Sequence, residues 1–134
     1  MVRIVVLNDN RKNNPQLENE HGLSLYIEVD GYKILLDAGQ TDIFKKNAKK
    51  LGVNLDDLDT IVLSHGHYDH GNGLKHIDKK IPLICCPGCD CYRVSKGTGN
   101  YGGLNQKIEE LSEKFDLIQT TEPYKITENI FFLG

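Results

Sequence analysis

Four side chains that can bind metal ions lie within six consecutive residues of this chain. The segment reads His65-Gly66-His67-Tyr68-Asp69-His70 and holds three of the five histidines in the sequence. Imidazole and carboxylate groups are ligands that suit zinc, iron and manganese. Because residues at positions i and i+2 of an extended segment point to the same side, we expect His65 and His67 to bind one ion. Asp69 and His70 then face a second position beside it.

This ligand pattern predicts hydrolytic chemistry. Two ions about 3.5–4 Å apart can hold a hydrolytic water and a leaving oxygen together. We therefore expect up to two divalent transition-metal ions. Zinc is the preferred identity, and iron and manganese are the alternatives. Asp69 is the catalytic candidate because its carboxylate can also orient the water. A solvated loop without metal is the competing interpretation, but the apolar strand before the segment and the glycines after it favour a metal site.

The hydrophobic pattern predicts the elements that position this segment. Residues 60–63 are short, apolar and β-branched, so the metal-binding segment is expected as a loop at the carboxyl end of a buried strand. A hairpin followed by alternating helices and strands predicts an α/β fold with a mixed sheet and helices on one face. At 134 residues the chain is expected to form a single domain, residues 1–134. Strands are expected at 2–7, 23–29, 32–36, 60–63, 81–85, 116–120 and 129–133, and helices at 41–51, 71–78 and 104–115.

The segment Ser64–Gly71 resembles the His-x-His-x-Asp-His signature of the metallo-β-lactamase superfamily of metal-dependent hydrolases. Residues 20–39 are similar to the opening strand pair of that family, and Asp37 matches its buried aspartate, which supports the metal loop. Residues 51–64 resemble the helix and strand that lead to the motif. The likeness covers nearly the whole chain and is nearest to the branch that contains the archaeal methanopterin-pathway synthase.

The resemblance implies an αβ/βα sandwich of two halves, of which this chain matches the N-terminal half. The family's later ligands are a histidine, an aspartate and a histidine, but no histidine follows His76. A catalytic zinc site usually has three protein ligands, whereas each pair here supplies two. We expect the isolated chain to be inactive and to need a separately encoded C-terminal half or a second copy of itself. A truncated or decayed relative is the remaining alternative.

All four cysteines lie in the segment Cys85–Cys91. In a cytosolic protein, clustered cysteines indicate metal binding or redox chemistry rather than structural disulfides. Cys86 and Cys89 form a C-x-x-C that can serve either role, although free reduced thiols are our first expectation. Cys86 also stands where the related branch has a His-Pro step near its active site. Cys86 and His21, the latter on the polar loop 8–21, are therefore candidates for the substrate pocket, and His21 can alternatively fill a gap among the metal ligands.

Charge and hydropathy exclude several classes of partner. The net charge is −3 and the pI about 5.9, and the lysines of 45–50 are the only basic cluster, so a nucleic-acid-binding face is not expected. No apolar run approaches the roughly 20 residues of a membrane span, and the first residues lack the features of a signal peptide. We expect a cytoplasmic protein that acts on a small-molecule substrate. The G-x-G-x-x-G at 97–102 follows polar residues rather than a strand, so a loop beside the cleft is preferred to a dinucleotide site.

Two other functions stay open at this point. One is a non-catalytic metal-binding or assembly module that needs a partner. The other is a thiol protein that acts through Cys86 and Cys89.

Overall fold

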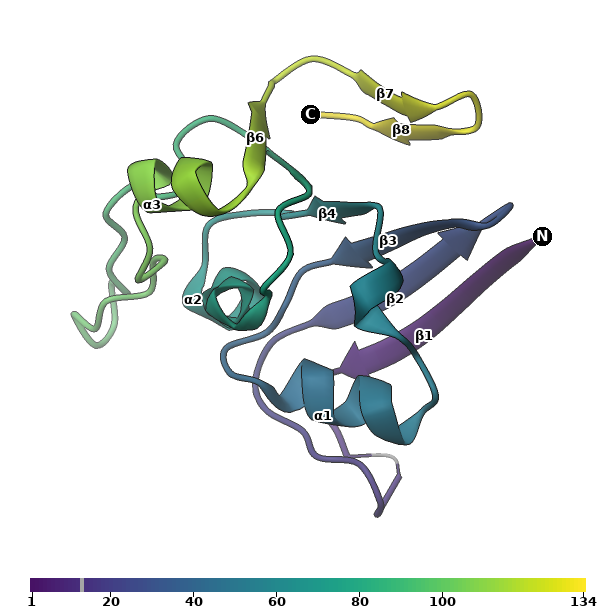
Figure 1. Cartoon of the computed structure of the whole chain (residues 1–134). Coiled ribbons are helices and arrows are strands. Elements are labelled where there is room, and N and C mark those ends of the chain that lie inside the picture. Colours follow the sequence, from purple (N-terminus) through teal and green to yellow (C-terminus); the bar gives the residue numbers. More distant parts are fainter. Residues whose placement is uncertain (13) are drawn as a thin grey trace.

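The computed structural model describes residues 1–12 and 14–134, and its central feature is a six-stranded mixed sheet (Figure 1). The spatial order of the strands is the same as their order in the chain. The first three strands are antiparallel, and each later strand runs parallel to the one before it. The strands are β1 (Val2–Asn8), β2 (Ser24–Val29), β3 (Tyr32–Leu36), β4 (Thr60–Val62), β5 (Pro82–Cys85) and β6 (Asp116–Gln119).

The hairpin between β2 and β3 turns at Asp30 and Gly31, as predicted. Both residues have positive φ, at 50° and 87°. Two consecutive positive φ values match the right-handed twist of the flanking strands, and Asp-Gly is a preferred pair for them.

The helices pack on one face of the sheet, which confirms the predicted α/β architecture. They are α1 (Ile43–Lys50), α2 (Tyr68–Gly71) and α3 (Ile108–Lys114), with 3-10 turns at Leu55–Asp57 and Asn72–His76. Phe44 of α1 and Leu111 of α3 are fully buried in one core with Leu35, Ile61 and Leu83 of the sheet. Each helix begins or ends within a few residues of its prediction, except that the helix expected at 71–78 is divided between α2 and the following 3-10 turn.

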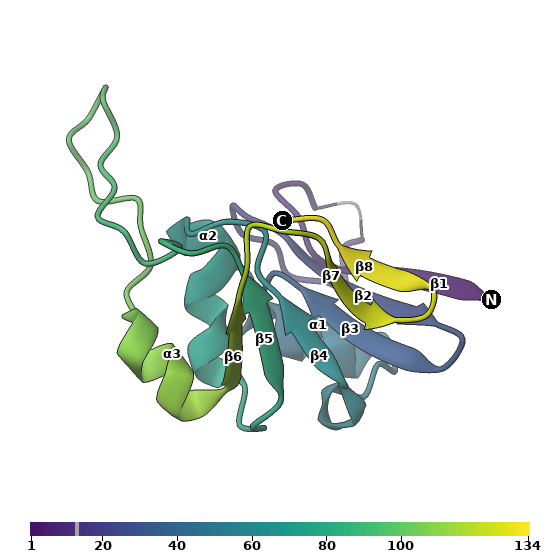
Figure 2. The same cartoon turned by 90° about the horizontal axis from the view of Figure 1, so that it is seen from above.

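The other face of the sheet carries a separate two-stranded ribbon. It consists of β7 (Tyr124–Thr127) and β8 (Ile130–Phe132), which pair antiparallel with each other and with no strand of the main sheet. Figures 1 and 2 show the ribbon on the side of the sheet opposite α1, and in Figure 2 it lies in front of β2 and β3. A largely apolar groove of about 230 Å³ separates it from the sheet, lined by residues such as Ile27, Ile34 and Phe132. The expected strand at 129–133 thus exists, but outside the main sheet, and β7 was not predicted.

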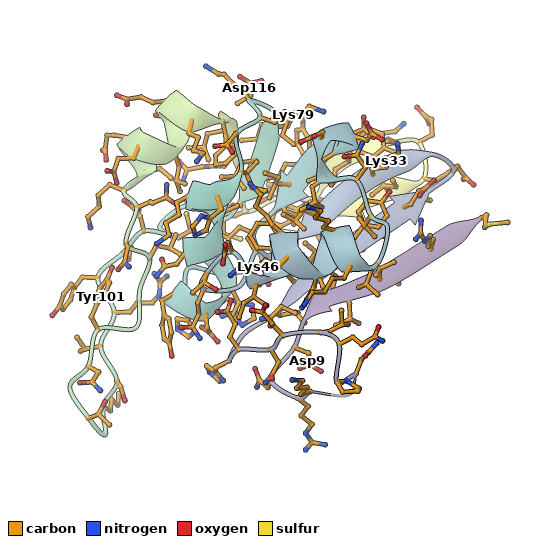
Figure 3. The ribbon with its side chains drawn as sticks, turned by 60° about the horizontal axis from the view of Figure 1, so that its bottom comes forward. Asp9, Lys33, Lys46, Lys79, Tyr101 and Asp116 are labelled. Carbon is orange, nitrogen blue, oxygen red and sulfur yellow. The ribbon has the colours of Figure 1, made fainter. Side chains whose placement is uncertain are left out.

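The parallel strands place the chemically interesting segments at one edge. Figure 3 shows Lys33, Lys79 and Asp116 at one end of the strands and Asp9 and Tyr101 at the other. The loops that follow β3, β4 and β5 leave the sheet at this second end, where ligands bind in open α/β sheets. Among the residues that the structure describes, none of the helices has the length and apolar character to cross a bilayer.

Candidate metal centre

Asp37 is the anchor of the loop that carries the histidines. It follows β3, is fully buried, and has a positive φ of 58°, which aspartate tolerates better than most residues. Its Oδ1 accepts a hydrogen bond from the backbone N–H of Ser64 at 2.8 Å. Its Oδ2 accepts the Ser64 hydroxyl at 2.6 Å and lies 2.7 Å from Nδ1 of His70. One carboxylate therefore holds both ends of the loop that follows β4.

These bonds fix how the imidazole rings of His65 and His70 point. Because the Ser64 hydroxyl donates to Asp37, its oxygen is left to accept from Nδ1 of His65, 2.8 Å away. Nδ1 of His70 likewise faces the Asp37 carboxylate. In both rings the Nε2 atom then carries the lone pair, which is the usual arrangement of histidines that bind metal ions.

His65 and His67 form the first pair of donors. Nε2 of His65 lies 3.1 Å from Nδ1 of His67, and the ring centroids are 4.6 Å apart. The ring of His70 lies 4.2 Å from that of His65, so the three histidines converge on one place at the edge of the sheet. His65 and His67 are exposed, whereas His70 is half-buried.

Asp69 and His70 form the second pair, and His21 joins it. Oδ2 of Asp69 lies 3.5 Å from Nε2 of His70 and 3.2 Å from Nε2 of His21. The Asp69 side chain is 10% exposed and that of His21 64%. The loop before β2 is held in place because Gln40 donates through Nε2 to the carbonyl of His21 at 2.6 Å and through its N–H to Glu20 at 2.9 Å.

Both donor pairs have the spacing that a tetrahedral ion requires. With ligand bonds of about 2.0–2.1 Å, two nitrogens on a tetrahedral zinc ion lie about 3.3–3.4 Å apart. The observed separations of 3.1 and 3.5 Å bracket that value. The described residues contain no group of three or more histidine, cysteine, aspartate or glutamate side chains placed to hold one ion. The fit to a metal ion therefore rests on the spacing within each pair.

The electrostatic environment shifts the pKa values of His65 and His70 in opposite directions. The hydrogen bond to Asp37 raises the pKa of His70 above its ordinary value of 6.5, although burial opposes it. Burial lowers the pKa of His65, and the neighbouring His70 and His67 lower it further. The lowered pKa favours the neutral form of His65, whereas the contact with Asp37 favours a proton on His70.

A second loop packs against the metal loop at Gly66. A Cβ at Gly66 would lie 1.6 Å from the carbonyl oxygen of Cys89, so only glycine allows this approach. The guanidinium of Arg93 donates to the carbonyls of Cys89 at 3.0 Å and Gly66 at 3.4 Å. Cys86 follows β5 at the same edge and is half-buried. Neither Ser64 nor Arg93 is predicted from the sequence to have a role, because a serine inside a motif and an arginine in an irregular loop carry no signal of their own.

The comparison with known proteins agrees with this geometry. A family model described as the metallo-beta-lactamase superfamily matches residues 18–84. A crystal structure of a metal-dependent hydrolase of the β-lactamase superfamily superimposes with a TM-score of 0.83 at 30% identity, covering 100% of this chain and 48% of that one.

Two curated relatives come from Methanocaldococcus jannaschii. An uncharacterized protein is 38% identical over 138 residues, which cover 100% of this chain and 52% of the relative. The other, named 7,8-dihydropterin-6-methyl-4-(beta-D-ribofuranosyl)-aminobenzene-5'-phosphate synthase, is 34% identical over 131 residues, covering 87% of this chain and 44% of the relative. The chain therefore spans about half the length of the curated relatives it matches, and the expected similarity to the methanopterin-pathway branch is confirmed. The family match, the superposed fold and the converging histidines agree that this chain belongs to the metallo-β-lactamase superfamily.

Proposed function

We propose that this chain is a component of a metal-dependent hydrolase. His65 and His67 bind one divalent transition-metal ion, and Asp69 and His70 bind a second. The observation that carries this assignment is the convergence of the two donor pairs at separations of 3.1 and 3.5 Å. Zinc suits a mixed imidazole and carboxylate site best, with iron or manganese as alternatives.

The residues around the ligands prepare them for this role. When bound, such ions lower the pKa of water toward about 7 and thereby supply hydroxide at neutral pH. Asp37 and Ser64 keep the Nε2 atoms of His70 and His65 directed toward the other proposed ligands, Asp69 and His67. Asp69 acts as the catalytic group that accepts a hydrogen bond from the attacking water. His21, which touches Asp69, and Cys86 border the place where a small-molecule substrate enters.

We further propose that a partner completes the site. Each donor pair supplies two ligands, and three protein ligands are usual at a catalytic zinc. The face of β1 away from the helices exposes Val2, Ile4 and Val6, which are 62, 59 and 50% exposed. A separately encoded C-terminal half or a second copy of the chain would cover this apolar face and bring further ligands to the same edge.

Elemental analysis of protein purified without a histidine tag tests the metal assignment. We expect the wild-type chain, after incubation with excess Zn²⁺ and gel filtration, to retain metal, and a His65→Ala/His67→Ala variant to lose most of it. His76→Ala is the matched control because His76 lies in the 3-10 turn after α2, outside the converging cluster. Equal metal content in the wild type and the double variant would contradict the assignment.

A further inference from the structure

The cysteines form a second group of reactive side chains beside the metal loop. Cys85 is the last residue of β5 and is fully buried, and Cys89, in the turn that follows, is 3% exposed. Their Sγ atoms lie 3.5 Å apart. Cys86 is half-buried and Cys91 exposed, and all four are free thiols. The structure therefore pairs Cys89 with Cys85, and not with Cys86 as the C-x-x-C spacing suggests.

The local backbone explains this pairing. Successive side chains of a strand point to opposite faces, so Cys85 points into the helix-covered core with Leu83, and Cys86 points away. Gly88 then adopts a φ of 76°, a conformation that glycine reaches without strain. The N–H of Cys91 donates to the carbonyl of Gly88 at 3.1 Å and closes the turn. This reversal returns the chain over the end of β5 and places Cys89 against Cys85.

We propose that Cys85 and Cys89 are a redox-active dithiol that hydrogen peroxide converts into a disulfide. A disulfide bond is about 2.05 Å long, so the two sulfur atoms must approach by about 1.5 Å from their separation of 3.5 Å. Only the short turn between them has to move. Peroxide is small enough to reach a sulfur that is almost covered, whereas a bulky disulfide reagent is not.

The surroundings of the pair make Cys89 the attacking sulfur. The contact with Cys85 lowers the pKa of the Cys89 thiol, and the Arg93 guanidinium adds to this lowering, although burial and Asp90 oppose it. The same contact and burial raise the pKa of Cys85. Since the thiolate is the nucleophile, Cys89 reacts first and Cys85 resolves the product.

The reaction proceeds in two balanced steps. The Cys89 thiolate attacks one oxygen of hydrogen peroxide and the O–O bond breaks, which leaves a sulfenic acid on Cys89 and hydroxide, and the proton released by Cys89 converts that hydroxide to water. The Cys85 sulfur then attacks the Cys89 sulfur and the S–O bond breaks. The departing hydroxide takes the Cys85 proton and leaves as a second water. Two thiols and one peroxide thus give one disulfide and two waters, and an external thiol reverses the change.

The turn also touches the metal loop. The Arg93 guanidinium bonds to the carbonyls of Gly88, Cys89 and Cys91 at 3.0 Å each and reaches that of Gly66 at 3.4 Å. A displacement of Cys89 is therefore passed to the segment between His65 and His67. The sulfur chemistry itself requires no metal ion in that segment.

Oxidation of the reduced, metal-free chain tests this dithiol. The chain is treated with hydrogen peroxide, quenched with catalase, denatured, alkylated with N-ethylmaleimide and weighed as an intact protein. We expect two of the four thiols to escape alkylation, with the loss of two hydrogen atoms, and dithiothreitol to restore all four. In Cys85→Ser the disulfide should be absent, and dimedone added during denaturation should label the sulfenic acid of Cys89.

A Cys86→Ser/Cys91→Ser variant is the matched control, because Cys85 and Cys89 are then the only cysteines left. It should form the monomeric disulfide as readily as the wild type, and it gives the answer even if Cys85→Ser fails to fold. Loss of the disulfide in this control, its persistence in Cys85→Ser, or peroxide damage confined to the exposed Cys91 would each overturn the assignment.

Discussion

The carboxylate of Asp37 lies 2.7 Å from Nδ1 of His70, although 33 positions separate the two residues in the chain. The same carboxylate accepts two hydrogen bonds from Ser64. The end of β3 is thereby tied to both ends of the loop that follows β4. The loop's shape depends on one buried charged group, and several measurable properties follow from it.

Asp37→Asn should lower the free energy of unfolding by about 2 kcal/mol, the usual scale for hydrogen bonds to a charged group. Asparagine also tolerates the positive φ at this position, so the loss would report the carboxylate rather than backbone strain. Urea denaturation of the metal-free chain measures it. Asp59→Asn is the matched control, since Asp59 is exposed and accepts one backbone hydrogen bond from Lys33. Equal losses in the two variants would show that the buried carboxylate has no special role.

The imidazole of His70 should titrate above pH 6.5 in the metal-free protein. Asp37 raises its pKa, so the protonated ring stabilises the folded chain. That contribution is fully present below pH 6.5, the ordinary value, and is lost as the pH rises through the folded-state pKa. Histidine ring NMR signals followed against pH give the value, and Asp37→Asn should lower it while leaving His76 unchanged. If the Asp37→Asn substitution leaves the pKa of His70 unchanged, the proposed coupling between His70 and Asp37 is refuted.

Gly66→Ala should damage both folding and metal binding. The new methyl group would lie 1.6 Å from the carbonyl oxygen of Cys89, and displacing this packed backbone should cost about 2–3 kcal/mol. Thermal unfolding and bound metal are the two readouts. Gly97→Ala is the control because a Cβ there meets nothing within 4 Å. If both variants unfold at the same temperature as the wild type, the metal loop and the cysteine loop do not pack together as described.

The purified chain should associate at micromolar concentration through the apolar face of β1. An interface that covers Val2, Ile4 and Val6 and continues over the adjacent β7–β8 ribbon would resemble a domain core cut in two, which usually buries more than about 2,000 Å² in total. Sedimentation velocity measures the mass, and Ile4→Lys should shift it toward the monomer. Glu113→Lys, on the exposed side of α3, controls for the added charge. A wild-type chain that sediments as a stable monomer would exclude self-association.

The chain alone should hydrolyse ester and phosphodiester substrates at no more than the background rate in the presence of Zn²⁺. The reason is that each donor pair supplies two ligands. Activity should appear only with a partner that contributes further ligands. Robust turnover by the purified chain that His65→Ala abolishes would show that its own residues suffice.

The sequence predicts the main sheet well because its strands are bounded by strong local signals. The Asp30-Gly31 turn and the β-branched run before His65 each specify their element without help from distant residues. The ribbon was harder to predict, since its strand Tyr124–Thr127 mixes polar and apolar residues. Its position is set by apolar side chains that face the sheet across the groove, which are distant in sequence. The convergence of His65 and His67 follows from their spacing, whereas the contacts of Ser64 depend on a residue 27 positions away.

The contact between Cys85 and Cys89 was equally difficult to predict from the sequence. Sequence spacing favours Cys86 as the partner of Cys89, but the direction in which β5 points its side chains and the turn at Gly88 decide the matter. Both depend on the register of β5 beside β4 and β6, which is a property of the whole sheet.

The strand order of the sheet has a consequence for biosynthesis. Every strand from β2 to β6 pairs with the strand made immediately before it, so a nascent chain can add each strand to the growing edge as it leaves the ribosome. Asp37 emerges before the loop that it holds, and that loop can close on it once His70 is outside the exit tunnel. The arginine that joins the cysteine turn to Gly66 arrives later still. We expect the histidine cluster to gain its native shape during synthesis, and its link to the cysteines to form in a separate, later step.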